Sequence, residues 1–214
     1  MKLTLVCFAV KEEASFFKRA IAGKENVRVL VTGMGKRNAE RGIQQALETG
    51  HPDLVISAGF AGGLRADLAM GTVVFCADRE TGLESALLAA GAQPGRFLCV
   101  ERVAATAKEK KALWKSSGAD AVEMESEALR AVCRQRQIPS ATIRVILDTV
   151  EQNLPLDFNL LMTDGERLSW QKLMLALAKS PGKIPELMGL QKQSVAAARQ
   201  LGEVLGKVVP RQGE

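Results

Sequence analysis

The chain has 214 residues, of which 47% are hydrophobic and 25% are charged. This composition is typical of a globular protein and excludes a disordered or fibrous chain, and the length predicts one domain. The 29 Lys and Arg residues exceed the 24 Asp and Glu residues by five. The absence of Tyr and of any arginine-rich run argues against a surface that reads or stacks on nucleic acid.

The opening apolar run, Leu3–Val10, is short and is followed at once by Lys11, Glu12 and Glu13. We interpret it as a strand and not as a signal peptide, because no cleavage site of small residues follows. No stretch approaches the roughly 18 apolar residues that a membrane span needs.

Five further apolar runs are interpreted as buried strands, and amphipathic segments lie between them. The runs are Val27–Val31, Leu54–Ser57, Gly71–Ala77, Arg96–Val100 and Ala141–Leu147, and the amphipathic segments are Asn38–Glu48, Ala107–Lys115 and Ala121–Gln137. Strands that alternate with helices predict an α/β fold with a mostly parallel or mixed sheet flanked by helices. The core is expected over residues 1–150 of a single domain, 1–214.

The pattern changes after Asp148. An irregular segment is followed by two predicted helices, about Leu168–Lys179 and Pro185–Val208. Apolar residues recur on one face of the second helix, so we expect it to pack on the sheet.

Cysteine usage bears on location and on metal binding. The chain has four widely spaced cysteines and one His, with no CxxC pair. This predicts reduced thiols, a cytoplasmic protein and no metal site. The cysteines are Cys7, Cys76, Cys99 and Cys133.

Polar and glycine-rich residues follow several of the predicted strands, where an open parallel sheet binds its ligands. Glu13 follows the first run, Thr32–Gly35 the second, Ser57–Gly63 the third, and Asp148 the last. These residues together indicate a binding site for a polar small molecule.

The two glycine-rich segments each have two interpretations. Gly33-Met34-Gly35 is either a tight turn or part of a dinucleotide site, but the third glycine of that fingerprint is replaced by Asn38. A Rossmann dehydrogenase that binds NAD is therefore a weak alternative. Gly59–Gly63 either lets backbone N–H groups approach an anion or a sugar, or allows dense packing beneath a helix.

Two carboxylates are candidate functional groups. Glu125 shares the apolar face of the predicted helix Ala121–Gln137, while Glu123 lies on the opposite, polar side, and a buried carboxylate needs a partner. That partner is either Arg144 or a ligand rich in hydroxyl groups. Asp148 is either a turn cap or, with Glu13, one of an acid and base pair. His51 is interpreted as a turn residue.

Four ordered motifs resemble the superfamily of purine nucleoside phosphorylases and methylthioadenosine nucleosidases. They are Thr32–Gly35, Pro52–Leu64, Val122–Ser126 and Arg144–Asp148. Within this superfamily, three sequence segments are similar to those of the hopanoid-associated phosphorylases: Gly59–Leu64, Arg102–Thr106 and Leu154-Pro155. That resemblance implies release of adenine from a nucleoside with a large 5′ group, such as adenosylhopane.

The resemblance also implies residue roles, without a metal or an organic cofactor. Asp148 is expected to protonate purine N7, Glu125 to hold the ribose hydroxyls, and Glu13 to activate water. The remaining expected substrate contacts are Met124, Gly33, Gly59, Phe60, Ala61, Ala105 and Thr106. The family implies a homo-oligomer that binds a purine nucleoside.

Departures from the family pattern leave the acceptor open between water and phosphate. Leu147 replaces a small hydroxyl residue before Asp148, Phe60 stands where phosphorylases use phosphate-binding groups, and Ala104–Thr106 replaces a stacking aromatic residue. The short segment Asp78–Arg96 suggests an open 5′ side. Leu154–Met162 is either a core connection or a wall for an apolar tail, with at most transient membrane contact. An inactive nucleoside-binding protein is the alternative function.

Overall fold

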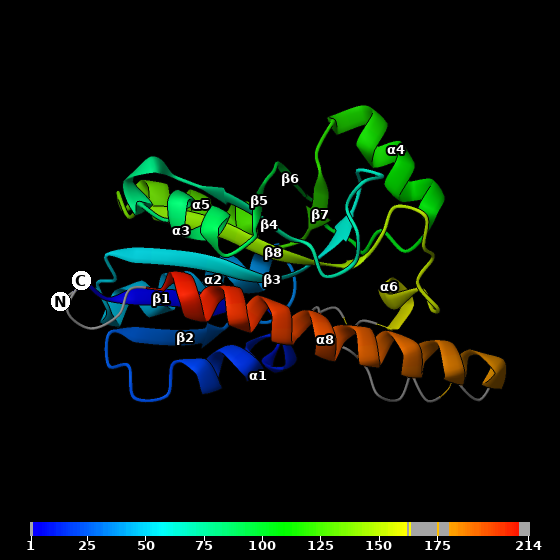
Figure 1. Ribbon diagram of the computed structural model, residues 1–214, viewed down its shortest axis with the longest axis horizontal. Helices are drawn as coiled ribbons and strands as arrows, with labels where there is room; N and C mark the ends of the chain where they lie inside the picture. Colours follow the sequence, from blue (N-terminus) through cyan, green and yellow to red (C-terminus); the bar gives the residue numbers. More distant parts are fainter. Residues whose placement is uncertain (1, 162, 164–174, 176–179, 210–214) are drawn as a thin grey trace.

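An eight-stranded mixed sheet forms the centre of the computed structural model, which describes residues 2–161, 163, 175 and 180–209 (Figure 1). Six strands run in the order β2-β1-β3-β8-β4-β5, and β7 joins the end of β3 and carries β6 beside it. The strands are β1 Thr4–Phe8, β2 Val27–Val31, β3 Leu54–Gly63, β4 Val73–Ala77, β5 Gln93–Pro94, β6 Phe97–Cys99, β7 Ala121–Glu123 and β8 Ser140–Asp148. The expected mixed α/β fold is confirmed.

Strands β3 and β8 are the longest and lie side by side at the centre. They pair in parallel from Val55 with Ser140 to Gly62 with Asp148, with a register shift between Ala61 and Gly62. Strand β4 is antiparallel to β8. Strand β3 therefore continues six residues past the predicted end at Ser57, because β8 and β7 pair with its glycine-rich half.

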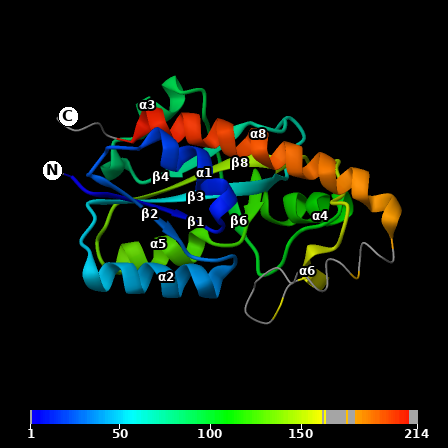
Figure 2. The ribbon, with the colours of Figure 1, turned by 90° about the horizontal axis from the view of Figure 1, so that it is seen from below.

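Helices cover both faces of the sheet (Figure 2). One face packs against α1, α3 and α8, and the other against α2 and α5. Helices α4 and α6 lie together at one end, beyond β7 (Figure 1). The helices are α1 Lys11–Ala20, α2 Lys36–Thr49, α3 Glu84–Ala89, α4 Ala107–Ser117, α5 Ser126–Gln135, α6 Phe158–Leu161 and α8 Ile184–Val208, with short 3-10 turns at Arg79–Thr81 and Pro181–Lys183.

The contact between α1 and α8 fixes the start of α1 over the sheet. Phe17 of α1 and Leu201 of α8 are both fully buried in the same core. Gly202 allows this approach, since a Cβ there would lie 2.8 Å from the Cβ of Phe16 and 2.9 Å from the backbone N of Phe17. The predicted helix Pro185–Val208 is confirmed as α8, whereas the predicted helix Leu168–Lys179 lies outside the described residues.

One sequence prediction was wrong. The predicted helix Ala121–Gln137 is strand β7 followed by α5, because pairing with β3 and β6 overrides the helical pattern over its first three residues. The segment Asp78–Arg96 begins where β8 starts, since Asp78 bonds to Ser140. The open 5′ side expected from its short length stays a prediction.

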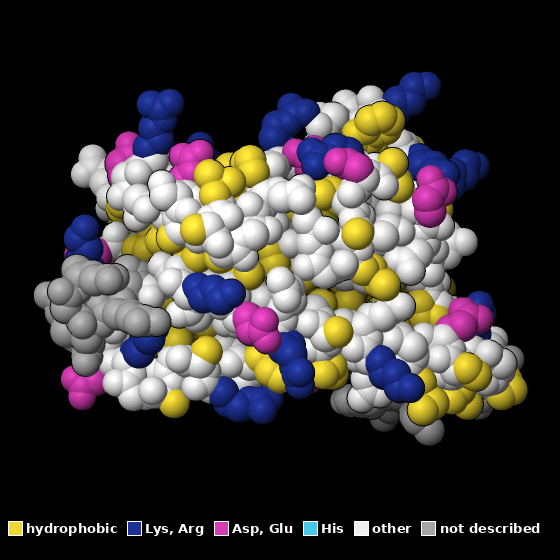
Figure 3. Space-filling view, viewed as in Figure 1, with side chains coloured by type: hydrophobic (Ala, Val, Ile, Leu, Met, Phe, Trp, Pro, Cys, Tyr) yellow, Lys and Arg dark blue, Asp and Glu magenta, His cyan; other side chains and the backbone are white. Residues whose placement is uncertain are grey.

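The surface carries its positive charge in a dispersed form. On the face seen in Figure 3, Lys and Arg side chains lie singly, with acidic side chains between them, and form no continuous basic patch. None of the helices in the described ranges is at once long and apolar enough to cross a membrane.

Candidate active site

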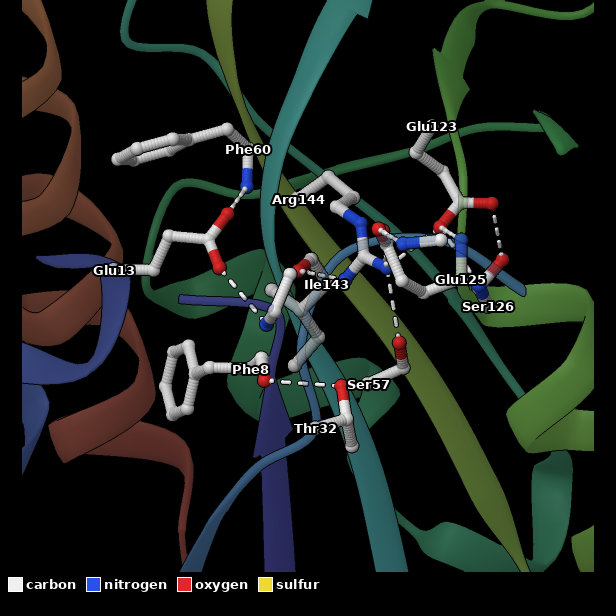
Figure 4. Close-up of polar contacts among 12 residues, drawn as sticks. Phe8, Glu13, Thr32, Ser57, Phe60, Glu123, Glu125, Ser126, Ile143 and Arg144 are labelled. Carbon is white, nitrogen blue, oxygen red and sulfur yellow. Dashed lines mark hydrogen bonds and ion pairs between the residues drawn. The ribbon is translucent and has the colours of Figure 1, made fainter. Parts of the chain in front are cut away.

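Carboxylates from three elements meet at the end of the sheet where β1, β3 and β8 finish (Figure 4). Figure 4 shows the guanidinium of Arg144, from β8, with Glu13 on one side and Glu123 and Glu125 on the other. All four residues are buried, with exposed fractions of 9% or less. Asp148 lies four residues further along β8, which is about 13 Å of extended strand.

Glu13 lies in the first turn of α1, and its carboxylate binds backbone N–H groups from two elements. Its Oε2 accepts hydrogen bonds from Ala9 at 3.0 Å and Val10 at 3.1 Å, and its Oε1 accepts one from Phe60 at 2.8 Å. Burial raises the pKa of Glu13, although these donors and Arg144 oppose the change. The carboxylate is therefore both oriented and a better proton acceptor than an exposed one.

Gly59 leaves space for this carboxylate. A Cβ at position 59 would lie 2.7 Å from Glu13 Oε1, closer than nonbonded atoms approach. The group that approaches Gly59 is Glu13 of helix α1, and contact of this segment with a ligand stays a prediction.

Arg144 is the cation of the cluster, and its main partner is Glu123. Its Nη2 donates to Glu123 Oε2 at 2.6 Å and to Ser57 Oγ at 3.0 Å. Burial raises the pKa of Glu123, but Arg144 and the Ser126 N–H more than offset it and hold that pKa below its usual value. Glu123 was expected on a solvent-facing side of the helix; it is instead buried, because it belongs to β7.

Glu125 directly precedes α5 and does not lie on a helix face, so the predicted reason for its burial was wrong. Its Oε1 accepts a hydrogen bond from the N–H of Gly35 at 2.8 Å, and its Oε2 lies 3.8 Å from Arg144. Burial raises the pKa of Glu125 to about 7, against the opposing effect of Arg144. Arg144 is thus a distant partner, and Glu125 has no close cation among the described residues.

Asp148, the last residue of β8, is paired with a lysine that the sequence analysis missed. Lys110 of α4 is fully buried, and its ammonium donates to Asp148 Oδ2. Burial raises the pKa of Asp148, and Lys110 partly opposes this. A signal was present, since Lys110 lies three residues from both Ala107 and Leu113 on the inward face of the predicted helix.

The other expected substrate contacts are placed as follows. Gly33 has a φ of 95° and donates to Ala9 O, at the turn that leads to Gly35. Met124 is partly buried between Glu123 and Glu125, and Phe60 and Ala61 lie on β3 beside Glu13. Ala105 is buried, while Thr106 is exposed and its hydroxyl is bound to Glu109 as the cap of α4. The contacts of these residues with a substrate stay predictions.

Two surface hollows lie away from this cluster. One of about 300 Å³ lies along the contact between α1 and α8, and one of about 250 Å³ is lined in part by His51. Neither contains any of the buried carboxylates described above. Among the described residues, no group of three His, Cys, Asp or Glu side chains is placed to hold a metal ion.

A family model described as the phosphorylase superfamily matches residues 6–87 and 80–177, so the chain belongs to this superfamily. Together with nucleosidases among its relatives, this makes it an enzyme of the nucleosidase and nucleoside phosphorylase class. The 5′-methylthioadenosine/S-adenosylhomocysteine nucleosidase of Shewanella pealeana is 29% identical over 178 residues, which cover 67% of this chain and 77% of that protein. The same enzyme of Glaesserella parasuis is 27% identical over 169 residues, 63% of this chain and 73% of that protein.

Solved structures show the same fold. The Campylobacter jejuni nucleosidase of the same name superposes with a TM-score of 0.71 at 12% identity, covering 97% of this chain and 98% of that chain. The futalosine hydrolase of Helicobacter pylori superposes with a TM-score of 0.67 at 14% identity, covering 95% and 97%.

Proposed function

We propose that this enzyme cleaves the N-glycosidic bond of a purine nucleoside and transfers the sugar to water. The observation that carries the proposal is that Glu13, Glu125 and Asp148 all lie toward the end of the sheet where β3 and β8 finish: Glu13 binds Phe60, and Asp148 pairs with Gly62, two residues further along β3. Cleavage of a glycosidic bond needs an acid for the leaving group and a nucleophile on the far side of the sugar. The carboxylates at this end of the sheet are proposed to carry out both tasks.

Glu125 is proposed to hold the ribose hydroxyls. Its Oε1 is fixed by the N–H of Gly35, and Oε2 is 3.8 Å from the nearest cation, Arg144. A buried carboxylate with a free oxygen is an acceptor for two adjacent hydroxyl donors. Met124, next to it in the chain and partly buried, is proposed to pack against the sugar.

Asp148 is proposed to deliver a proton to purine N7, so that the base leaves as a neutral molecule. Burial raises the pKa of its carboxyl group, which favours a proton donor at this position. Gly62 lies directly beside it, since a Cβ there would be 3.7 Å from Asp148 Oδ1.

The local charge supports water over phosphate as the acceptor. The cluster contains three buried carboxylates, Glu13, Glu123 and Glu125, and one cation, Arg144, which already binds Glu123. A phosphate dianion at this end of the site would meet net negative charge in a weakly screened interior. Neutral water meets no such repulsion, and Glu13 is placed to accept its proton.

The proposed substrate is an adenosine with a 5′ substituent. Relatives at 26–29% identity are named for methylthioadenosine and S-adenosylhomocysteine. A larger apolar 5′ group, as in adenosylhopane, is supported by the resemblance to hopanoid-associated phosphorylases. It is also supported by Leu160, which is 71% exposed on α6 next to Asn159, the residue that bonds to the Val103 loop.

A base-release assay tests the proposal. Adenosine, 5′-methylthioadenosine and a 5′-alkyl adenosine are incubated with the enzyme, with and without phosphate, and free adenine and the sugar product are measured. We expect adenine and a free reducing sugar without phosphate. Sugar 1-phosphate as the main product would contradict the choice of water, and intact nucleosides under all conditions would contradict the proposal itself.

The role of Asp148 is tested with Asp148→Asn and a surface control. We expect kcat to fall by roughly 100- to 10,000-fold, since a general acid contributes about that much, while KM changes less than about threefold because Glu125 still holds the sugar. Asp67→Asn, which removes an exposed partner of Arg65, is expected to leave both constants unchanged. Full turnover by Asp148→Asn would rule out the role of acid.

A further inference from the structure

Lys110 is the one fully buried lysine among the described residues. A lysine side chain is rarely excluded from water without a charged partner. Its ammonium donates to Asp148 Oδ2 and to the carbonyl of Thr149, whereas Lys108 and Lys111 of the same helix are exposed. The orientation of helix α4 thus selects one lysine of this run and places it against the proposed acid.

This pairing changes what Asp148 can do. The ammonium of Lys110 favours the ionised carboxylate, and an ionised carboxylate has no proton to give. Burial acts in the other direction and leaves the pKa of Asp148 above its usual value. The ammonium and the carboxyl group are in direct hydrogen-bond contact, so a proton can pass from one to the other in a site that is nearly closed to water.

The geometry also decides which oxygen faces a ligand. Lys110 binds Oδ2, and no described residue donates a hydrogen bond to Oδ1. Both oxygens lie beside Gly62, where a Cβ would be 3.5 Å from Oδ2 and 3.7 Å from Oδ1, so the bond to Lys110 is what distinguishes them. Lys110 thus fixes the carboxyl group by one oxygen and leaves the other for the base.

We propose that Lys110 is a positioning residue that acts through Asp148 and supplies the proton that the purine receives. The inference rests on the proposed function. When the bond between C1′ and N9 breaks, its electron pair goes to the purine, and N7 takes a proton from Asp148. Asp148 receives that proton from the ammonium of Lys110, so Asp148 ends as a carboxylate and Lys110 ends as a neutral amine.

The steps at the sugar complete the proton balance. Water forms the new bond to C1′ and gives its proton to Glu13. Before the next turnover, solvent returns a proton to Lys110 and accepts one from Glu13. No oxidant, metal or cofactor takes part in these steps.

Two variants of Lys110 and one neighbouring control test the inference with two substrates. Lys110→Met removes the charge, and Lys110→Arg keeps the charge but holds its proton too firmly to release it. Lys111→Met removes an exposed lysine that binds Glu151. Turnover is measured with 5′-methylthioadenosine, whose base needs a proton, and with p-nitrophenyl β-D-ribofuranoside, whose leaving group does not. Thermal unfolding reports whether each variant is folded.

We expect both Lys110 variants to lower kcat for methylthioadenosine by about 100-fold, within the range of a lost general acid. KM for methylthioadenosine is expected to change less than about threefold. The turnover of the nitrophenyl riboside by each Lys110 variant is also expected to stay within about threefold of wild type. Lys111→Met should match wild type with both substrates.

Two results would overturn the inference. Wild-type kcat in Lys110→Arg would mean that charge alone suffices and that no proton comes from this residue. An equal loss with both substrates in a folded variant would mean that Lys110 only maintains the shape of the site. Failure of the wild type to release adenine is a separate result and would reject the proposed function, and the inference with it.

Discussion

Replacing Glu125 by Gln tests whether this carboxylate is retained for a ligand although it lowers stability. Burial raises its pKa from 4.5 to about 7. Between these pH values the folded protein holds a proton on Glu125 that the unfolded chain has lost, so the free energy of unfolding falls as pH rises through this window. A pKa difference of one between the folded and unfolded states corresponds to about 1.4 kcal/mol, so the whole difference corresponds to about 3 kcal/mol.

Glu125→Gln is uncharged at every pH and escapes this loss. Relative to wild type, the variant should gain about 3 kcal/mol of unfolding free energy between pH 4.5 and pH 8. In a chain of this size, about 2–4 °C of melting temperature accompanies each kcal/mol, so the gain is roughly 6–12 °C. The same variant should raise KM and lower kcat, because a carboxamide is a weaker acceptor for the ribose hydroxyls.

Glu123→Gln is the matched control, two residues away in the same buried cluster. Glu123 binds Arg144 at 2.6 Å, and its pKa is held below the usual value. Its removal leaves Arg144 without its close partner and should cost roughly 3–5 kcal/mol at pH 8. Urea and thermal unfolding of both variants from pH 4.5 to 8 gives the comparison. If Glu125→Gln loses stability at pH 8 as Glu123→Gln does, then Glu125 is a structural partner of Arg144 and the ligand interpretation is refuted.

Four further substitutions test the packing of α1 against α8 and the role of Glu13 as the base. Gly202→Ala should destabilise by roughly 1–3 kcal/mol and reduce activity, since its Cβ would meet Phe16 and push α1 away, whereas Gly189→Ala in the same helix, with open space around it, should stabilise by about 0.5–1 kcal/mol. Thermal unfolding measures both changes in stability. If Gly202→Ala and Gly189→Ala changed stability equally, the packing of α1 against Gly202 would not explain the result. Gly59→Ala should lower kcat at least as much as Glu13→Gln, which is expected to lose roughly 100-fold or more in base-release assays. Near-wild-type turnover in either would exclude Glu13 as the base.

Strand positions and strand ends were the most predictable features. The run at Val27–Val31 coincides with β2, and Asp148 ends β8 as expected, because apolar runs bounded by polar residues are local signals. Helix α1 was not predicted. Its first turn places Glu13, and its apolar face depends on α8, far away in sequence. The position of Glu13 was therefore predictable, while the N–H donors that orient it were not.

The region around Glu125 shows why local periodicity is insufficient. Residues 121–123 fit a helical pattern, but Gly62 and Gly63 of β3 offer backbone groups with which β7 pairs. That pairing moves Glu123 from a supposed outer face into the interior, where it takes Arg144 as its partner. Glu125 is left buried with a more distant cation. The burial was predicted correctly for an incorrect reason.

Charge balance connects the stability of the site with its chemistry. Glu13, Glu123 and Glu125 face a single guanidinium, so full ionisation leaves an excess of negative charge in the interior, and burial raises the pKa of two of the three carboxylates. A neutral nucleoside does not relieve this excess. The sugar of the transition state carries positive charge, as an oxocarbenium-like species, and does relieve it. In the proposed mechanism, the cluster is therefore complementary to the transition state more than to the substrate, which is the condition for an increase in kcat and not in binding alone.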